Sequence, residues 1–292
     1  MTKKNSKFFE EKGYLLLNDY FTEIEIDNLR EKIKQLSNGN RNTFLFSSLC
    51  LSEKKIYEVI FNKKLIEVYR EIIQDEVYLV PELHVQINMF PKNNRHGWHY
   101  DGQSERENGY LKDPNRKFFR VGIYLQDNTV NYGGGIDILN NRLFKKLPFK
   151  INNRIEKLII QFYASFFSKK VDTKKGSVII FDSRLPHKGT FPLKNPKEKN
   201  FHDKYTIYFQ IGNKEHCNNF IKKNIERMFI NYGSDPATVK YFLDYLKLSF
   251  PNDFQSEFRS MLKENNINIM GSDEVDSNFF KEFEKYLKIS KN

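Results

Sequence analysis

The sequence predicts a mostly β protein whose core is an antiparallel sandwich or barrel, with helices before this core and a helical extension after it. Short runs rich in β-branched and aromatic residues are separated by clusters of glycine, proline and asparagine, and no βαβ rhythm connects them. Apolar residues at helical spacing mark the segments on either side. With 292 residues, the chain can bury one substantial core.

The N-terminal part is predicted to form a short helical turn, a strand at residues 14–17 and two helices. Thr22 followed by Glu25 has the pattern of a capping box, which predicts where the first long helix begins. Near-helical spacing of apolar residues predicts a second helix at residues 53–74. The apolar face of the first helix is expected to consist of Ile24, Ile26, Leu29, Ile33 and Leu36.

The core is predicted to contain five further strands, at residues 77–90, 118–125, 135–139, 177–181 and 205–211. A basic, aromatic helical insertion at residues 142–171 interrupts them. One stripe of that insertion is expected to pack on the sheet, although a membrane interface is the alternative. The stripe consists of Ile151, Ile155, Leu158, Ile159, Phe162 and Phe166. Beyond Gly212, balanced charge and helical patterns predict an α-helical extension over residues 213–292 that packs on a domain formed by residues 1–212.

The net charge of +11 is confined to one stretch of the chain. Residues 142–204 carry 16 Lys and Arg against 5 Asp and Glu, whereas the flanking stretches balance at 20 against 20 and 12 against 12. This surplus favours an anionic substrate or a lipid surface, and a solvated lysine-rich surface is the alternative. Nucleic acid is disfavoured, because stacking aromatics do not alternate with basic residues. The absence of a signal peptide or spanning segment predicts a cytoplasmic protein.

The residues that indicate chemistry are two histidines and one aspartate. His99 and Asp101 are separated by one residue, so on a strand or its edge both side chains project to the same side. His187 follows a β-rich run 86 positions after Asp101. Two histidines and one carboxylate can bind one face of Fe(II) and leave positions open for a cosubstrate and dioxygen. We therefore predict His99, Asp101 and His187 as iron ligands.

Four phrases that surround these ligands resemble the phytanoyl-CoA dioxygenase-like family of Fe(II)/2-oxoglutarate-dependent oxygenases. They are FFEEKGYLLLNDYFTEIEIDNL, GWHYD, VGIYLQDNTVNYGGGIDIL and KKGSVIIFDSRLPHKGT, and they occur in this order between residues 8 and 190. The resemblance implies a double-stranded β-helix core of the jelly-roll, cupin-like type. It also implies Fe(II), 2-oxoglutarate and O2 as cofactors, and hydroxylation of a C–H bond with release of succinate and CO2.

The sequence departs from this family where the cosubstrate would be held. Relatives usually carry an arginine after the distal histidine, but only lysines occur here, and Lys204 fits the role best, as a point charge. Arg120 is expected to share the charge of the cosubstrate, with an exposed ion pair as the alternative. Gln103, Trp98 and Arg184, together with Lys145 and Lys146 of the insertion, are the candidate substrate contacts. Arg184 is also expected to pair with Asp182.

The predicted function is therefore a dioxygenase acting on a small, anionic molecule that is phosphorylated, nucleotide-linked or lipid-linked. Peripheral membrane contact through residues 142–171 is a further possibility that the pattern leaves open. Two other classes compete with the oxygenase. A non-oxidative, metal-dependent enzyme on a cupin-like barrel would bind a metal without needing oxygen, and an inactive β-sandwich binding protein would need neither.

Overall fold

The computed structural model describes residues 4–40, 43–46, 50, 52–90, 97–101, 113, 115–129, 131–139, 153–195, 203–221, 257 and 260–269. The chain divides into two compact units. Unit 1 comprises residues 1–45, 84–103 and 119–208, and unit 2 comprises residues 46–83, 104–118 and 209–292. All three predicted iron ligands lie in unit 1. The predicted domain boundary at residue 212 stays a prediction.

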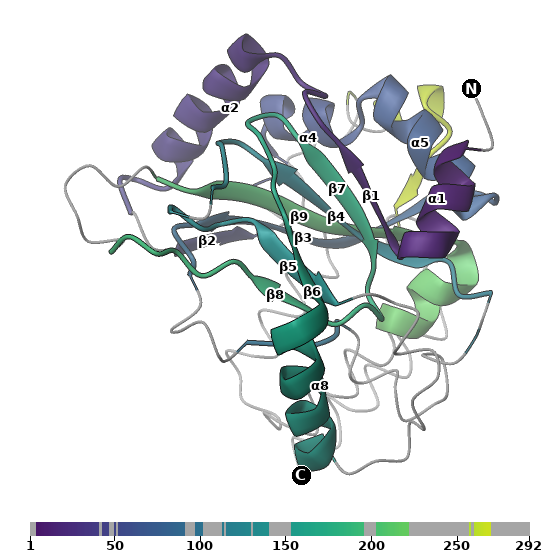
Figure 1. Ribbon diagram of the computed structural model, residues 1–292. Helices are drawn as coiled ribbons and strands as arrows, with labels where there is room; N and C mark the ends of the chain where they lie inside the picture. The colour runs from purple at the N-terminus through teal and green to yellow at the C-terminus, as the bar shows by residue number, and fades with distance from the viewer. Residues whose placement is uncertain are drawn as a thin grey trace, which may run out of the picture. The chain divides into compact units, whose positions relative to one another are not determined.

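The helices named in Figure 1 are α1 (Lys4–Lys12), α2 (Glu23–Leu36), α4 (Lys54–Ile60), α5 (Lys63–Ile73) and α8 (Asn153–Phe167). The capping box that begins α2 is confirmed, since Thr22 Oγ1 accepts from Glu25 N at 3.3 Å and Glu25 Oε2 accepts from Thr22 N at 2.8 Å. Of its predicted apolar face, Ile26, Leu29 and Ile33 are buried, but Ile24 is 75% exposed. Including Ile24 in that face was wrong.

The single helix predicted at residues 53–74 is two helices. α4 ends at Ile60, and Asn62 begins α5 by accepting hydrogen bonds at its side-chain oxygen from Lys64 N and Leu65 N. An asparagine in this position satisfies amide groups that the first turn of a helix leaves without partners. The local cap therefore divides an apolar pattern that looked continuous.

The strands form two sheets. The larger has the order β1-β7-β4-β9-β3-β10, with β2 paired to β3, and the smaller has the order β6-β5-β8. Their bounds are β1 (Tyr14–Leu17), β2 (Thr43–Phe46), β3 (Tyr78–Ile87), β4 (Phe118–Tyr124), β5 (Ile136–Leu139), β6 (Ser168–Val171), β7 (Val178–Asp182), β8 (His187–Gly189), β9 (Tyr205–Gly212) and β10 (Asn268–Ile269).

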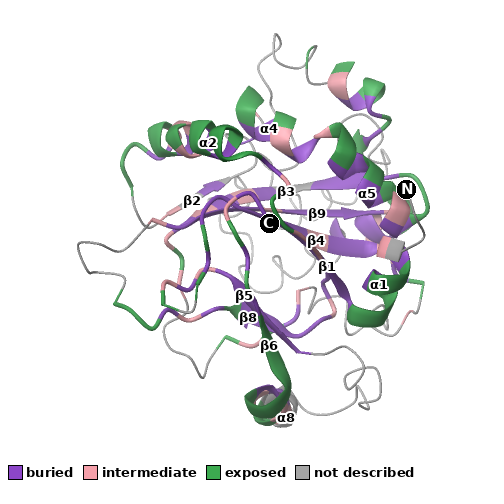
Figure 2. Cartoon of the chain, turned by 45° about the horizontal axis from the view of Figure 1, so that its top comes forward, coloured by how far each residue is buried: buried purple, intermediate pink, exposed green. Residues whose placement is uncertain are grey.

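In unit 1 the two sheets face each other across a hydrophobic core. This core joins side chains of β1, β4 and β7 to side chains of β5 and β6. Figure 2 colours β4 and β5 largely as buried. Its members are Tyr14, Tyr124, Ile136, Ile138, Val171, Ile179, Phe181 and Leu185. Arg120 lies opposite Phe181 in the β4–β7 ladder and so projects to the same side as this core. The mostly β, two-sheet architecture confirms the predicted fold class in its coarse form.

A glycine in β4 makes room for one aromatic ring. A Cβ on Gly122 would lie 2.7 Å from Cε1 of Tyr208, closer than real side chains allow. Tyr208 OH lies 3.3 Å from Tyr124 OH, and either hydroxyl can donate this hydrogen bond. Gly122 therefore lets Tyr208 lie across β4, beside Arg120, whose guanidinium carbon is 5.8 Å from the centre of that ring.

Four short strands were not predicted: β2, β6, β8 and β10. β6 pairs with β5 over all four of its residues, so residues 168–171 of the predicted helical insertion are a strand. β10 pairs with β3 inside the region predicted as helical extension. Of that extension, residues 214–221 and 260–264 are helical, and most of the rest lies outside the described residues.

The face of α8 that packs on the protein is also not the predicted one. Ile160 and Ala164 are 2% and 3% exposed, whereas Leu158, Phe162 and Phe166 of the predicted stripe are 66%, 66% and 69% exposed. Ile151 and the side chain of Ile155 lie outside the described residues. Among the described helices, none is long and apolar enough to cross a membrane.

Candidate metal centre

The backbone brings the two histidines together although they are 88 positions apart in the chain. His99 N donates to His187 O at 3.0 Å, and His187 N donates to His99 O at 2.9 Å, which is one rung of an antiparallel pair. Asp101 N donates to Ser183 O at 3.0 Å. Residues 97–101 thus lie against the turn between β7 and β8, which brings the ligand residues of the two segments next to each other.

The three side chains converge at one point. One nitrogen or oxygen from each of His99, Asp101 and His187 lies within 4.8 Å of the others, and no other such group occurs among the described residues. Nε2 of His99 is 3.8 Å from Asp101 Oδ1, and Nε2 of His187 is 3.6 Å from Asp101 Oδ2. These separations suit atoms that share a metal ion between them. The structure thus brings together all three predicted iron ligands.

Hydrogen bonds to the backbone orient both imidazole rings. Nδ1 of His99 lies 2.6 Å from Gly97 O, and Nδ1 of His187 lies 2.8 Å from Leu185 O. Because a carbonyl oxygen only accepts, each Nδ1 carries the proton, and each Nε2 presents its lone pair toward Asp101. Metal-binding histidines in proteins are oriented in this way.

The electrostatics favour the metal-binding form of His187 and of Asp101. Burial lowers the pKa of His187 to about 4, which keeps its imidazole neutral. Burial alone would raise the pKa of Asp101, but Arg120 and the histidines outweigh it and lower the pKa below its ordinary value. A neutral imidazole and an ionised carboxylate are the forms that bind metal. Two imidazole nitrogens and one largely buried carboxylate make up a donor set that can bind one face of Fe(II), so the residues present fit an iron ion.

Arg120 contacts the predicted metal ligand itself. Its Nη1 lies 3.0 Å from Asp101 Oδ2, and the two side chains are 15% and 14% exposed. The alternative of an ion pair with a nearby acid is thus present, but the pair is largely shielded from water and not exposed. The predicted contact of Arg120 with the cosubstrate stays a prediction. His84 is a further neutral group close to this pair. Burial, with an added effect of the positive charge on Arg120, lowers the pKa of His84 to about 3.

Arg120→Gln is expected to weaken the binding of a divalent metal by about 10- to 100-fold, because a partner that orients a ligating carboxylate typically contributes that much. Anaerobic titration with Fe(II) or Co(II) measures the affinity. Arg30→Gln is the matched control, since Arg30 is also partly buried but donates to the carbonyl of Leu125 at 2.8 Å. Unchanged affinity in Arg120→Gln would show that Arg120 does not support the centre.

A pocket in unit 1 holds Lys204. Lys204, Thr206 and Tyr208 alternate along the start of β9, and all three line this pocket. The other lining residues are Gln86, Met89, Gly134, Gly135, Gly189 and Thr190. Tyr208 connects the pocket to Arg120 and hence to the metal ligands. The sequence interpretation missed Thr206 and Tyr208, although their alternation with Lys204 was a signal that could have identified them.

Lys204 is held in place inside the pocket. It is 3% exposed, and its Nζ donates to Asp127 O at 2.7 Å. The same Nζ lies 5.6 Å from the centre of the Tyr132 ring. A Cβ on Gly134, where φ is +83°, would lie 3.0 Å from Cδ of Lys204, so glycine lets this side chain pass. Burial lowers the pKa of Lys204 to about 8.

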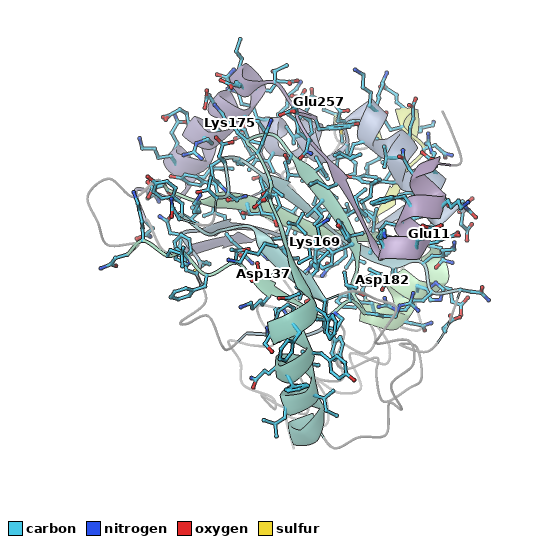
Figure 3. The ribbon with its side chains drawn as sticks, in the orientation of Figure 1. Glu11, Asp137, Lys169, Lys175, Asp182 and Glu257 are labelled. Carbon is cyan, nitrogen blue, oxygen red and sulfur yellow. The ribbon has the colours of Figure 1, made fainter. Side chains whose placement is uncertain are left out.

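The remaining predicted site residues lie elsewhere in unit 1 or outside the described residues. Arg184 Nε donates to Asp182 Oδ1 at 2.9 Å, which confirms this structural pair; Asp182 is labelled in Figure 3. Trp98 is partly buried beside α8, and Nζ of Lys188 lies 5.4 Å from its ring. Their contact with substrate stays a prediction. Gln103, Lys145 and Lys146 lie outside the described residues.

Comparison with models of known protein families finds no match, and no curated protein sequence matches. Solved structures do match in fold. HygX from Streptomyces hygroscopicus, crystallised with nickel and 2-oxoglutarate, has 13% sequence identity and a TM-score of 0.55, and the match covers 73% of this chain and 88% of HygX. EctD from S. alaskensis, crystallised with 2-oxoglutarate and 5-hydroxyectoine, has 18% identity and a TM-score of 0.52, with 74% and 77% covered.

A third structure is that of SnoN, a non-haem α-ketoglutarate-dependent epimerase from nogalamycin biosynthesis. It has 10% identity and a TM-score of 0.51, with 72% of this chain and 81% of SnoN covered. The chain therefore has the jelly-roll-like fold of non-haem, 2-oxoglutarate-dependent enzymes. Iron and 2-oxoglutarate, two of the cofactors predicted from the sequence, are bound in crystals of these neighbours, and one HygX crystal holds nickel.

Proposed function

We propose that the protein is an Fe(II)- and 2-oxoglutarate-dependent oxygenase of the phytanoyl-CoA dioxygenase-like type that hydroxylates a C–H bond of a small molecule. The observation that carries the proposal is the convergence of His99, Asp101 and His187 in an enzyme fold that uses this chemistry. In the overall reaction, one oxygen atom of O2 enters the substrate and the other enters succinate, and CO2 is released.

The three ligands would hold iron on one face and leave its other positions open. When bound, iron with 2-oxoglutarate supplies the oxidising chemistry that amino-acid side chains lack. The protein keeps Asp101 ionised through Arg120 and keeps His187 neutral through burial. Both ring orientations are set by backbone carbonyls, so the ligand atoms need little rearrangement to bind.

The cosubstrate would be anchored in the pocket at the start of β9. Lys204 Nζ has three hydrogens and donates one of them to Asp127 O, so two remain for a carboxylate. Thr206, two residues later on the same side of the strand, offers a hydroxyl to the same pocket. An ammonium and a hydroxyl side by side suit an anion such as the distal carboxylate of 2-oxoglutarate.

The substrate is proposed to be small and anionic. The support is the excess of positive charge in residues 142–204, with 16 basic residues against 5 acidic ones. HygX was crystallised with hygromycin B and SnoN with nogalamycin RO, so the same fold accommodates small molecules of different shapes. His99 is 47% exposed, which leaves one side of the candidate metal centre accessible from solvent.

Anaerobic titration of the metal-free protein with Fe(II) and 2-oxoglutarate tests the proposal. A weak visible charge-transfer band is expected when the two bind together, and oxygen should then be consumed with formation of succinate. Metal binding without a band would favour the non-oxidative cupin-like enzyme. Failure to bind metal at all would favour a β-sandwich binding protein without catalysis.

A further inference from the structure

α8 has two faces of opposite character. Ile160 and Ala164 are buried against Tyr100 and Leu139, with Trp98 and Tyr163 packed on the same cluster. The other face is formed by large apolar side chains that are 66%, 66%, 69% and 53% exposed: Leu158, Phe162, Phe166 and Phe167. We call these four residues the α8 apolar face. Figure 2 shows this helix largely in the colour of exposed residues.

The α8 apolar face is a cluster and not a scatter of single residues. It contains four of the eight large hydrophobic side chains that are exposed in the described part of the chain. The ring centre of Phe162 lies 5.4 Å from that of Phe166, and the ring centre of Phe166 lies 6.4 Å from that of Phe167. A contiguous apolar patch of this kind on a helix usually marks a binding surface.

The charged residues that neighbour this face in sequence are mostly basic. Residues 153–175 contain six Lys and Arg against two acidic residues, Glu156 and Asp172, and the exposed Lys169 and Lys170 lie just after the helix. Lys169 is labelled in Figure 3 and donates from Nζ to Tyr14 OH at 3.2 Å. An exposed aromatic face beside lysines is typical of helices that lie in the interface of an anionic membrane.

We propose that α8 is a docking surface for an anionic lipid membrane, with the α8 apolar face inserted among the lipids and the lysines at the headgroups. A second copy of the chain is the competing occupant, and self-association is one of the outcomes that the test below distinguishes. The buried side of α8 packs on Trp98 and Tyr100, which flank the predicted ligand His99. If the proposed function holds, docking would bring the metal centre close to a lipid-linked substrate.

Sedimentation with vesicles tests the docking surface. The protein is expected to sediment with vesicles of phosphatidylcholine and phosphatidylglycerol but not with phosphatidylcholine alone, and added salt should weaken the binding. The double variant Phe162→Ser/Phe166→Ser should lower the partition coefficient by at least about ten-fold, since it removes two aromatic anchors. Phe8→Ser, which changes an exposed phenylalanine on α1, is the matched control and should bind as the wild type.

Two further measurements separate the possible outcomes. Trp98 is the only tryptophan and packs beside α8, so its fluorescence should shift on docking to anionic vesicles. Lys170→Glu should weaken this docking, whereas Lys174→Glu, away from the helix end, should not. Wild-type protein that ignores anionic vesicles, or a double variant that binds them unchanged, would overturn the proposal. So would self-association that the double variant abolishes without any vesicle binding.

The docking surface and the proposed function can fail separately. The charge-transfer band with Fe(II) and 2-oxoglutarate is measured on the same double variant, which leaves the predicted ligands untouched. If the double variant loses vesicle binding but keeps the band, the result supports the docking surface and leaves the metal centre intact. If the wild type binds vesicles but gives no band, only the proposed oxygenase function is overturned.

Discussion

Asp101→Asn is expected to lower the affinity for Fe(II) by at least about 100-fold and to abolish 2-oxoglutarate-dependent oxygen consumption. The substitution keeps the shape of the side chain but removes the negative charge that faces both imidazole rings. A neutral amide oxygen is a weaker ligand for iron than a carboxylate. It also leaves the guanidinium of Arg120 without its counter-charge in a largely buried place.

Equilibrium dialysis against Fe(II) without oxygen measures the first effect, and release of succinate measures the second. Asp172→Asn is a suitable control because Asp172 is exposed and lies between β6 and β7. Circular dichroism of Asp101→Asn should remain that of a folded protein, so that loss of metal is not mistaken for loss of fold. Wild-type metal affinity in Asp101→Asn would refute the assignment of this aspartate as a ligand.

Lys204→Met is expected to weaken 2-oxoglutarate binding by roughly 10- to 100-fold, the loss expected for one charge-assisted hydrogen bond. The reason is the position of Lys204, which is buried and lines the pocket beside Thr206 and Tyr208. Methionine fills a similar volume without the charge. Metal affinity in the absence of 2-oxoglutarate should stay unchanged, which separates this effect from damage to the three metal ligands.

The same lysine predicts how cosubstrate binding depends on pH. Burial lowers the pKa of Lys204 to about 8, so the side chain is charged below that pH and becomes neutral above it. Affinity for 2-oxoglutarate should therefore be nearly constant below pH 8 and fall by about ten-fold per unit above it. Lys204→Arg should remove this decline, because arginine stays protonated. A wild-type affinity that is flat to pH 10 would contradict the anchor.

The parts of the fold that were predictable rest on local signals. The capping box of Thr22 and Glu25 needs only residues that are neighbours in sequence, and the longer strands have strong β patterns. The short strands have no such signal. β6, with the sequence SKKV, is a strand because β5 pairs with each of its residues, and its pattern of lysines alone would not predict one.

The orientation of α8 depended on long-range packing in a similar way. Apolar residues occur around most of this helix, so the sequence could not decide whether Ile160 or Phe162 meets the protein. Packing against Leu139 and Tyr100 decided it. The close approach of His99 and Asp101 to His187 was predictable from residue types. The partner of Arg120 was not, because it depends on the register of β4 against β7.

The reciprocal hydrogen bonds between His99 and His187 have a consequence for unfolding. This rung ties residues 97–101 to the turn between β7 and β8, and both of its residues are predicted ligands. An ion bound by the side chains of these residues would form a second link between the two segments. It would dissociate when the segments separate. Because such an ion binds only the folded chain, a concentration of 100 times its Kd would add about 2.7 kcal/mol to the free energy of unfolding. The candidate metal centre would then also hold these two segments together, and the melting temperature would rise with the fraction of the protein that has metal bound.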